Sequence, residues 1–363
     1  MAGPFQKSFW AAGVLCLGTL SCFGMGNEVS ISPDDPKIQY SGRIDFTNPK
    51  LPRFDWPKVS ITAEFSGKSV GILLKDGGNN YNVFVDGKLN QTIITKPEVE
   101  RYDVKGLSSG SHLLRVVKRT EASWGIAVFK GLVLDKDGTL EEPPAPSKRR
   151  IEIIGDSLSC GYGNEGPGLE CKELRPYQNS DQAYGAFLER DLSAEVRITA
   201  ISGKGVVRNY GDKAKSSPDP MPSFYDRTLA GDVTLKWDFG QWIPGAFILF
   251  LGSNDFSTEP YPDQEFFVKA YKNLIQVVRK NYPKVQIFCI GRPDLSNMGT
   301  FVEDAVKAET AKGDLRINYI SIPPFRQDEL GCDWHPKVVA HRKLADYLLP
   351  TFEKTMKWEK MGD

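Results

Sequence analysis

The hydrophobic pattern of this chain changes once, at the proline-rich and charged segment EEPPAPSKRR, residues 141–150. Before this segment, short apolar runs follow one another with period two and frequent turn residues, which is typical of β-strands. After it, strand-like apolar runs alternate with stretches of helical spacing. Because a proline- and charge-rich stretch is stiff and cannot form a core, we interpret residues 141–150 as a linker between two domains. The length of 363 residues also suggests two domains.

The first domain, residues 27–140, is predicted to be an antiparallel β-sandwich. In the run VSITAEFSG apolar side chains alternate from Val59 to Phe65, and the pair Asp86-Gly87 stands at a hairpin position. The runs SHLLRVVKRT and GIAVFKGLVLD continue this rhythm, and no long helix interrupts it. Several short strands at such spacing favour a sandwich. Its aromatic residues are interpreted as packing residues of the core in preference to a glycan platform.

The second domain, residues 151–363, is predicted to be a three-layer α/β/α fold. Helical segments separate five apolar runs, IEIIGDS, EVRITAISG, AFILFLGSND, VQIFCIG and INYISIP. Strands that alternate with helices give a parallel sheet, here of five strands, with helices on both faces. Ligands of such folds bind beyond the carboxyl ends of the strands. The residues that follow these runs are therefore the candidates for chemistry.

The pattern of the first 26 residues differs from that of both predicted domains. Lys7 precedes the short apolar stretch WAAGVLCLGTLSCFG, which ends in small residues. This pattern predicts a secretory signal at residues 1–26, and hence an exported protein with no membrane insertion after cleavage. An uncleaved anchor is the alternative. Cys22 follows Thr-Leu-Ser, a faint match to a bacterial lipoprotein box, so lipoprotein anchoring is a further alternative.

The charge balance and the histidine count exclude several classes of function. Forty-six basic and 46 acidic side chains give a formal net charge of zero. Without a cationic excess the chain lacks the attraction that drives binding to phosphate backbones, so nucleic acid and anionic membranes are not expected partners. Only His112, His335 and His341 can supply an imidazole. A three-histidine zinc site would use all of them, so no metal site is expected.

Four cysteines follow the signal segment, and none of them forms a C-x-x-C pair. In an oxidising compartment Cys160 and Cys171 could close a short loop, although spacing alone does not decide this. Cys289 lies in the apolar run VQIFCI and is interpreted as a buried free thiol. Cys332 has no assigned partner. A thiol nucleophile is therefore poorly supported.

Ser157 follows the first apolar run, in the block Ile154-Gly155-Asp156-Ser157-Leu158. A serine at a tight turn after a strand exposes its hydroxyl as a nucleophile and places its own N–H beside a developing oxyanion. A helix cap or a phosphate-loop residue is the alternative. The chain has no G-x-x-x-x-G-K-[ST] motif, and Ser157 lacks the G-x-S-x-G surroundings of the common α/β-hydrolases. Asp156 is expected to stabilise the turn.

Three further blocks complete a candidate site. Gly203, in ISGKG, offers an unobstructed backbone N–H, although a merely flexible turn is the alternative, and Asn254, in LGSND, offers a side-chain amide. With the N–H of Ser157 they would form an oxyanion hole. In DWHP, Asp333 stands two residues before His335. This spacing suits a Ser-His-Asp relay with His335 as general base and acid.

Together, the blocks GDSLSCGYGNEG, SGKGVVRNY, LGSNDFS and DWHP resemble the SGNH (GDSL-type) hydrolase superfamily. The four residues for which that superfamily is named map to Ser157, Gly203, Asn254 and His335. With NYNVFVDGK in the first domain, the chain more narrowly resembles carbohydrate esterase family 2 over most of residues 38–350. The resemblance implies a jelly-roll first domain and a sugar O-acetylesterase, acetylxylan esterase-like, without metal or organic cofactor. Its substrates would be acetylated polysaccharides or oligosaccharides such as xylan and glucomannan.

The resemblance also leaves alternatives open. Some members of the family orient the histidine through a backbone carbonyl, so the Asp333 carboxylate is either the third catalytic group or structural. Trp334 either stacks on a sugar ring or packs against the protein. An esterase for lipid or aryl esters and a carbohydrate-binding protein with a non-catalytic hydrolase-like domain are the competing functions. His112 is expected to be structural and His341 partly exposed, Asp255 and Asp294 are given no role, and a monomer is expected.

Overall fold

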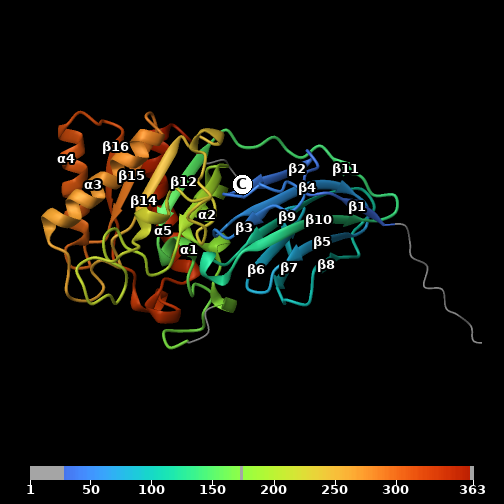
Figure 1. Cartoon of the computed structure of the whole chain (residues 1–363), viewed down its shortest axis with the longest axis horizontal. Coiled ribbons are helices and arrows are strands. Elements are labelled where there is room, and N and C mark those ends of the chain that lie inside the picture. The colour runs from blue at the N-terminus through green and yellow to red at the C-terminus, as the bar shows by residue number, and fades with distance from the viewer. Residues whose placement is uncertain (1–27, 172–174, 360–363) are drawn as a thin grey trace, which may run out of the picture.

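The computed structural model describes residues 28–171 and 175–359. The signal segment expected at residues 1–26 lies outside these residues. Two regions lie side by side along the long axis of the molecule (Figure 1). We call residues 28–141 the β region and residues 150–359 the α/β region.

The β region consists of two antiparallel sheets that face each other across one core. Their strand orders are β1-β10-β5-β8, with β3 also on β10, and β11-β4-β9-β6-β7, with β2 also on β4. The first sheet contains β1 (Val29–Ile31), β3 (Arg53–Phe54), β5 (Val70–Lys75), β8 (Arg101–Val104) and β10 (Ala127–Leu134), and the second contains β2 (Ile38–Ser41), β4 (Ser60–Ser66), β6 (Asn80–Val85), β7 (Lys88–Ile94), β9 (Ser111–Lys118) and β11 (Leu140–Glu141). The predicted antiparallel sandwich is confirmed.

Local sequence accounts for the strands and turns of the β region. Along β4, Ile61, Ala63 and Phe65 are each at most 1% exposed, because alternate side chains of a strand point to the same face. Asp86 and Gly87 join β6 to β7, with φ of 52° and 76°. Two successive positive φ values are those of the tight hairpin turn that Asp-Gly favours.

The α/β region contains a five-stranded parallel sheet in the order β13-β12-β14-β15-β16. The central strand β14 is buried at every position, as expected where helices cover both faces. The strands are β12 (Arg150–Gly155), β13 (Glu195–Ala200), β14 (Ala246–Phe250), β15 (Gln286–Gly291) and β16 (Ile317–Ser321), and the helices are α1 (Ser157–Cys160), α2 (Tyr184–Asp191), α3 (Gln264–Asn281), α4 (Met298–Ala311) and α5 (Val338–Met356). The predicted fold is confirmed, and α4 lies between the fourth and fifth apolar runs, which a helical segment was expected to separate.

The register of the sheet aligns the loops that carry the candidate residues. Gly155, the last residue of β12, lies opposite Ala200 at the end of β13 and opposite Phe250 at the end of β14. The loops that follow these three strands therefore begin side by side at one edge of the sheet. They carry the serine, glycine and asparagine blocks of the sequence.

The two regions meet through buried polar contacts. Arg43 of the β region forms an ion pair of 2.8 Å with Glu152 of β12, and the exposed fractions of the two side chains are 2% and 3%. The same guanidinium donates to the backbone oxygens of Tyr225 and Arg227. Trp56 donates its indole N–H to the oxygen of Thr228. Residues 142–149, within the predicted linker, join β11 to β12 without helix or strand.

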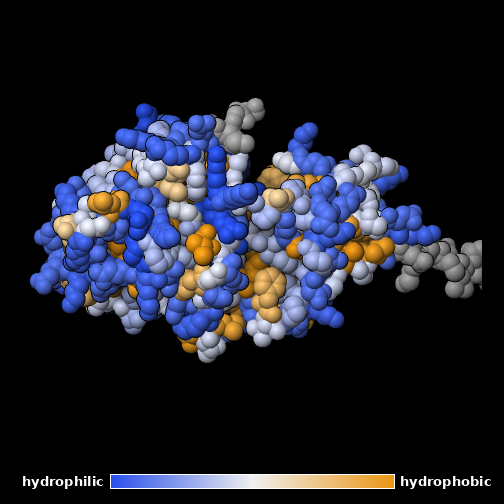
Figure 2. All heavy atoms as spheres, turned by 90° about the horizontal axis from the view of Figure 1, so that it is seen from above, coloured by the Kyte–Doolittle hydropathy of each residue, from blue (hydrophilic) through white to orange (hydrophobic). Residues whose placement is uncertain are grey.

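The face of the molecule in Figure 2 is mostly hydrophilic, and its apolar side chains form small separate groups. In the part of the chain that the structure describes, every helix is too short or too polar to cross a bilayer.

The disulfide considered between Cys160 and Cys171 is not formed. Cys171 is bonded to Cys332, 161 residues away in the sequence, whereas Cys160 is a buried free thiol in α1. The short spacing of the first pair was misleading because the chain folds Cys332 onto the loop after α1. Cys289 is a buried free thiol, as expected.

The Arg43–Glu152 pair gives a prediction about stability. Replacement of Arg43 by alanine leaves the Glu152 carboxylate buried without its partner, which should lower the free energy of unfolding by about 3–5 kcal/mol. Urea unfolding followed by circular dichroism would measure this. Arg101→Ala, which removes the exposed pair with Glu28, is the matched control and should cost much less. Equal losses for the two variants would contradict a special role of the buried pair.

Candidate active site

Ser157 lies at a tight turn directly after β12. Asp156 caps α1: its carboxylate accepts the backbone N–H of Leu158 at 3.1 Å. A Cβ atom at Gly155 would lie 1.9 Å from the hydroxyl oxygen of Ser159, so only glycine fits between β12 and the helix. The turn holds Ser157 at the carboxyl edge of the sheet with a 7% exposed side chain. Asp156 thus stabilises the turn, as expected.

His335 is in hydrogen-bond contact with Ser157. The distance from its Nε2 to the Ser157 Oγ is 2.8 Å. On the other side of the ring, Nδ1 lies 2.9 Å from the backbone oxygen of Asp333. Because a carbonyl oxygen can only accept a hydrogen bond, Nδ1 must carry the proton, which leaves Nε2 free to accept the proton of Ser157.

The Asp333 carboxylate makes no hydrogen bond to His335 in this structure, and this geometry favours the backbone alternative for Asp333. Its Oδ2 accepts a hydrogen bond of 3.0 Å from the hydroxyl of Tyr162. The reason is conformational: Asp333 and Trp334 have φ of 48° and 62°, and this turn directs the Asp333 carbonyl toward the ring. A left-handed backbone conformation at a residue other than glycine destabilises the fold by about 1–3 kcal/mol, and it persists only where the surrounding structure imposes it.

The surroundings impose this turn from several sides. Asp333 donates its N–H to the oxygen of Leu169, and Gly331 donates to the oxygen of His335. The preceding residue, Cys332, is disulfide-bonded to Cys171. The loop that carries the imidazole is therefore attached to the loop that follows the serine.

Gly203 lies in a tight turn after β13. The N–H of Lys204 bonds to the oxygen of Ile201, and Gly203 has φ of 79° between them. A Cβ atom here would meet nothing closer than 3.9 Å, so glycine is required by the positive φ and not by space. This conformation determines which way the Gly203 N–H points.

Asn254 and Asp255 reinforce the same edge of the sheet. The Asn254 amide donates to the oxygen of Lys204 at 2.9 Å and to the Asp156 carboxylate at 3.3 Å. The Asp255 carboxylate, fully buried, accepts three backbone N–H groups, those of residues 206, 207 and 208. Asp255, given no role from the sequence, thus holds the segment after Gly203. The sequence signal that could have pointed to Asp255 is its position directly after Asn254.

Ser157, Gly203, Asn254, Asp333, Trp334 and His335 all line one pocket of about 530 Å³. Tyr162, Ser202 and Tyr210 complete its wall. The exposed fractions of Trp334 and Tyr210 are 64% and 66%, so two aromatic rings face solvent beside the serine. Tyr162 packs against the imidazole with ring centroids 4.4 Å apart. Tyr162 and Tyr210 were not singled out from the sequence.

Burial tunes the titratable groups of the pocket. Desolvation lowers the pKa of His335 below its ordinary value, which favours the neutral ring. Desolvation also raises the pKa of Asp156 to about 7, against the opposing hydrogen bond from Leu158. A neutral imidazole is the form that can accept a proton from serine.

The other two histidines take no part in this pocket. His341 was expected to be partly exposed, and this is wrong: its ring is fully buried on α5 and stacks on Tyr184, with ring centroids 6.4 Å apart. Burial lowers the pKa of His341 to about 3. His112, on β9, bonds to the Asp86 carboxylate at 2.7 Å, in keeping with a structural role. Among the described residues no group of histidine, cysteine and carboxylate side chains is placed to hold a metal ion.

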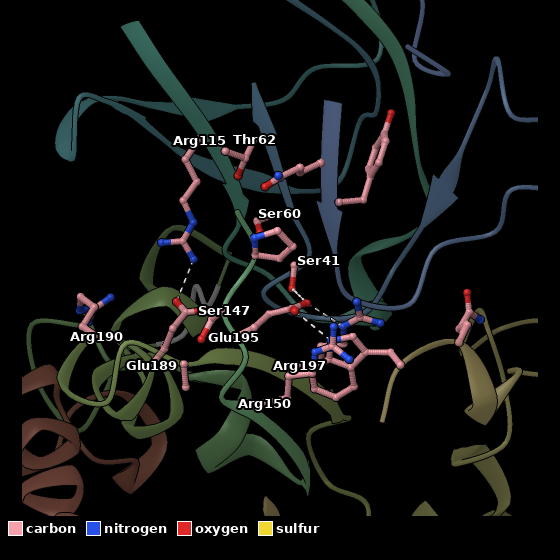
Figure 3. Close-up of a pocket in the computed structure, with 16 residues that line it drawn as sticks. Ser41, Ser60, Thr62, Arg115, Ser147, Arg150, Glu189, Arg190, Glu195 and Arg197 are labelled. Carbon is pink, nitrogen blue, oxygen red and sulfur yellow. Dashed lines mark hydrogen bonds and ion pairs between the residues drawn. The ribbon is translucent and has the colours of Figure 1, made fainter. Parts of the chain in front are cut away.

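A second cavity, of about 500 Å³, lies between the two regions on the amino-terminal side of the sheet (Figure 3). Four arginines and two glutamates line it, and both glutamates are paired: Arg115 with Glu189 at 2.8 Å, and Arg197 with Glu195 at 3.0 Å. Ser41 also donates to Glu195. No histidine lines this second cavity, so none of its hydroxyl groups is bonded to an imidazole. The cavity therefore lacks the chemistry of the serine pocket.

The chain matches known families over both regions. Residues 151–348 match the family described as GDSL-like Lipase/Acylhydrolase, and residues 40–144 match the one described as Carbohydrate esterase 2 N-terminal. The α/β region is therefore a hydrolase domain of the GDSL type.

Two relatives identify the family within the GDSL-type hydrolases to which this chain belongs. The chain is 36% identical over 341 residues to the cellulase/esterase CelE of Acetivibrio thermocellus, a match that spans 90% of this chain and 40% of that protein. It is 31% identical over 309 residues to an acetylxylan esterase / glucomannan deacetylase of Cellvibrio japonicus, over 82% of this chain and 84% of the relative. This chain belongs to carbohydrate esterase family 2, as its motifs predicted.

Solved structures agree with this assignment. A family two carbohydrate esterase from Clostridium thermocellum, in complex with cellohexaose, superposes with a TM-score of 0.83 at 34% identity, over 88% of this chain and 99% of the other. One from Cellvibrio japonicus gives a TM-score of 0.81 at 23% identity, over 91% and 98%, and supports the fold alone.

The carbonyl contact of His335 predicts the behaviour of an Asp333 variant. Asp333→Asn keeps the backbone, tolerates the left-handed φ and still offers an oxygen to Tyr162. Its kcat on p-nitrophenyl acetate should stay within about threefold of the wild type, whereas loss of a triad carboxylate costs about 10⁴-fold. Steady-state kinetics measure this, with circular dichroism as the control for folding. A loss of a thousandfold or more would return the carboxylate to the mechanism.

The environment of His335 predicts the acid limb of the pH profile. The base works as the neutral ring, so kcat/KM should fall as pH drops through the His335 pKa, which desolvation places below about 6.5. The limb should remain in Asp156→Asn, which removes the neighbouring carboxyl group that also titrates near neutrality. A limb that disappears in this variant would assign it to Asp156 instead.

Proposed function

We propose that this protein is a secreted carbohydrate O-acetylesterase that removes acetyl groups from plant cell-wall polysaccharide, with Ser157 as the nucleophile. The observation that carries the proposal is the 2.8 Å contact between the Ser157 Oγ and an imidazole Nε2 that is free to accept its proton. Backbone and side-chain N–H donors of Gly203 and Asn254 line the same pocket.

Acylation would proceed by attack of the Ser157 Oγ on the acetyl carbonyl carbon. The hydroxyl proton passes to His335 Nε2, and the imidazolium is stabilised by its Nδ1–H bond to the Asp333 oxygen. The tetrahedral oxyanion would accept hydrogen bonds from the N–H groups of Ser157 and Gly203 and from the Asn254 amide, which would exchange its 3.3 Å bond to Asp156 for this one. The carbon–oxygen bond to the sugar then breaks as His335 returns the proton to the departing sugar oxygen.

Deacylation would repeat these steps with water. His335 takes a proton from water while the water oxygen attacks the acetyl-serine carbonyl carbon. The Ser157 oxygen leaves with that proton, and acetate is released. No step requires a metal or organic cofactor, because serine, imidazole and N–H donors supply the nucleophile, the base and the oxyanion stabilisation.

A carbohydrate substrate is favoured by the rim of the pocket and by the relatives. Trp334 and Tyr210 present exposed aromatic rings beside Ser157, and such rings stack on the apolar faces of sugars. The Cellvibrio relative is named for acetylxylan and glucomannan, and the Clostridium structure holds cellohexaose. Export, a monomeric state and acetylated polysaccharide as substrate are parts of the proposal.

Acetate release tests the proposal. The purified protein should release acetate from acetylated xylan and glucomannan and hydrolyse p-nitrophenyl acetate, and Ser157→Ala should abolish both activities. Enzymatic quantification of acetate gives the readout. Rapid turnover of butyrate and longer esters without release from polysaccharide would instead indicate a lipid or aryl esterase, and binding without turnover a carbohydrate-binding protein.

Trp334→Ala separates carbohydrate recognition from ester chemistry. If the indole binds sugar, KM for acetylated xylo-oligosaccharides should rise roughly two- to tenfold, while p-nitrophenyl acetate turnover changes little. Tyr347→Ala removes an exposed ring on α5 outside the pocket and serves as the control. An equal change for both substrates would argue against a role in sugar binding.

A further inference from the structure

A buried carboxylate of the β region contacts the serine pocket. Glu121 follows β9 and precedes the short helix η1 (Ala122–Trp124), and its side chain is 2% exposed. It is the last of four consecutive buried polar residues, Lys118 to Glu121. The mechanism proposed above does not use it, and nothing in its own sequence neighbourhood marks it as functional.

The segment that carries Glu121 is inserted into the α/β region. The Ser180 N–H donates to the oxygen of Arg119, and the Ser180 hydroxyl donates to the oxygen of Lys118. The Lys118 ammonium bends the segment by donating to the oxygens of Thr120 and Glu121. The backbone of this segment is therefore attached on both sides.

The Glu121 carboxylate binds the residue before Gly203. Its Oε2 accepts the backbone N–H of Ser202 at 2.7 Å, and its Oε1 accepts the Ser202 hydroxyl at 2.6 Å. The Gln178 amide donates to Oε1 at 2.9 Å. Hydrogen bonds to a carboxylate are about twice as strong as neutral ones, and two of them on one residue restrict both its backbone and its side chain.

These contacts lie on both sides of the peptide that carries the Gly203 N–H. The peptide that carries it lies between two anchored groups: the Ser202 N–H on Glu121, and the Gly203 carbonyl, which accepts the N–H of Tyr210 at 2.8 Å. With both neighbours held, the two ends of that peptide are fixed in place, and its N–H can change direction only by a flip of the whole peptide plane. Gly203 itself has a positive φ and would otherwise be conformationally permissive.

We propose that Glu121 is a positioning residue for the oxyanion hole, which makes the β region a part of the active site. The carboxylate acts through Ser202 and aims the Gly203 N–H at the developing oxyanion. This inference rests on the proposed acyl transfer. It assigns the β region a positioning role in catalysis, in addition to any role in binding glycan.

Glu121→Gln tests the inference directly. In glutamine, one of the two carboxylate oxygens is replaced by an amide nitrogen, which cannot accept a hydrogen bond. The variant can therefore accept the Ser202 N–H or the Ser202 hydroxyl at its single oxygen, but not each at its own oxygen. We expect kcat for p-nitrophenyl acetate to fall about 10- to 100-fold with little change in KM, since loss of a whole oxyanion donor costs about 10² to 10³. A boronic acid, which mimics the tetrahedral intermediate, should bind correspondingly more weakly.

Glu165→Gln is the matched control. Glu165 also crosses the interface, to Arg119, and does not contact the Gly203 turn. It should affect thermal stability without a specific loss of kcat. If Glu121→Gln keeps kcat within twofold of the wild type, or if Glu165→Gln loses kcat to the same extent, the inference is wrong.

Ser202→Ala covers the case in which Glu121→Gln does not fold. It removes the hydroxyl bond and keeps the backbone bond, so kcat should fall about 3- to 10-fold; unchanged kcat would overturn the inference. When both variants fold, the double variant should lose less than the product of the single losses, because both act on one contact. A wild-type protein that hydrolyses no ester and is not labelled at Ser157 by a phosphonate would refute the proposed function itself.

Discussion

The in-register pairing of β12 with β13 and β14 is the constraint on which the candidate site depends. Gly155 lies opposite Ala200 and Phe250, so the loops with Ser157, Gly203 and Asn254 leave the sheet at one level. A shift of one residue in either pairing would move a loop by about 3.3 Å, more than a hydrogen bond tolerates. The buried apolar side chains of these strands thus contribute to the site through the register that they impose.

Signals that are local in the chain were readable from the sequence. The change of hydrophobic period predicted the fold of both regions. Four short blocks predicted Ser157, Gly203, Asn254 and His335 as site residues, because the end of a strand and the residues that follow it are neighbours in sequence and in space. Pairings of distant segments were not readable. The Cys171–Cys332 bond joins residues 161 apart, and the burial of His341 depends on where α5 packs. Which atom of Asp333 meets the imidazole depends on two φ angles that no motif encodes.

The interface between the regions is polar for a physical reason that packing alone does not explain. Burial of charges such as Arg43 and Glu152 costs free energy that their attraction only partly offsets, so replacement by apolar groups would often be neutral. Directional bonds, however, also restrict the relative placement of the two regions. A carboxylate that must reach a turn 81 residues away, as Glu121 reaches Ser202, needs such a defined placement.

The oxyanion turn shows why that placement matters for chemistry. Beyond Ala200 the chain has left β13 and no longer has strand partners, yet an N–H donor stabilises a transition state only if its direction is set in advance. Two carboxylates outside the turn supply this: Glu121 binds Ser202 before Gly203, and Asp255 binds three N–H groups after it. Glu121 follows β9 of the β region, and Asp255 follows β14 of the α/β region. An isolated hydrolase domain would therefore keep Ser157 and His335 but lose one of the two groups that orient its backbone donor.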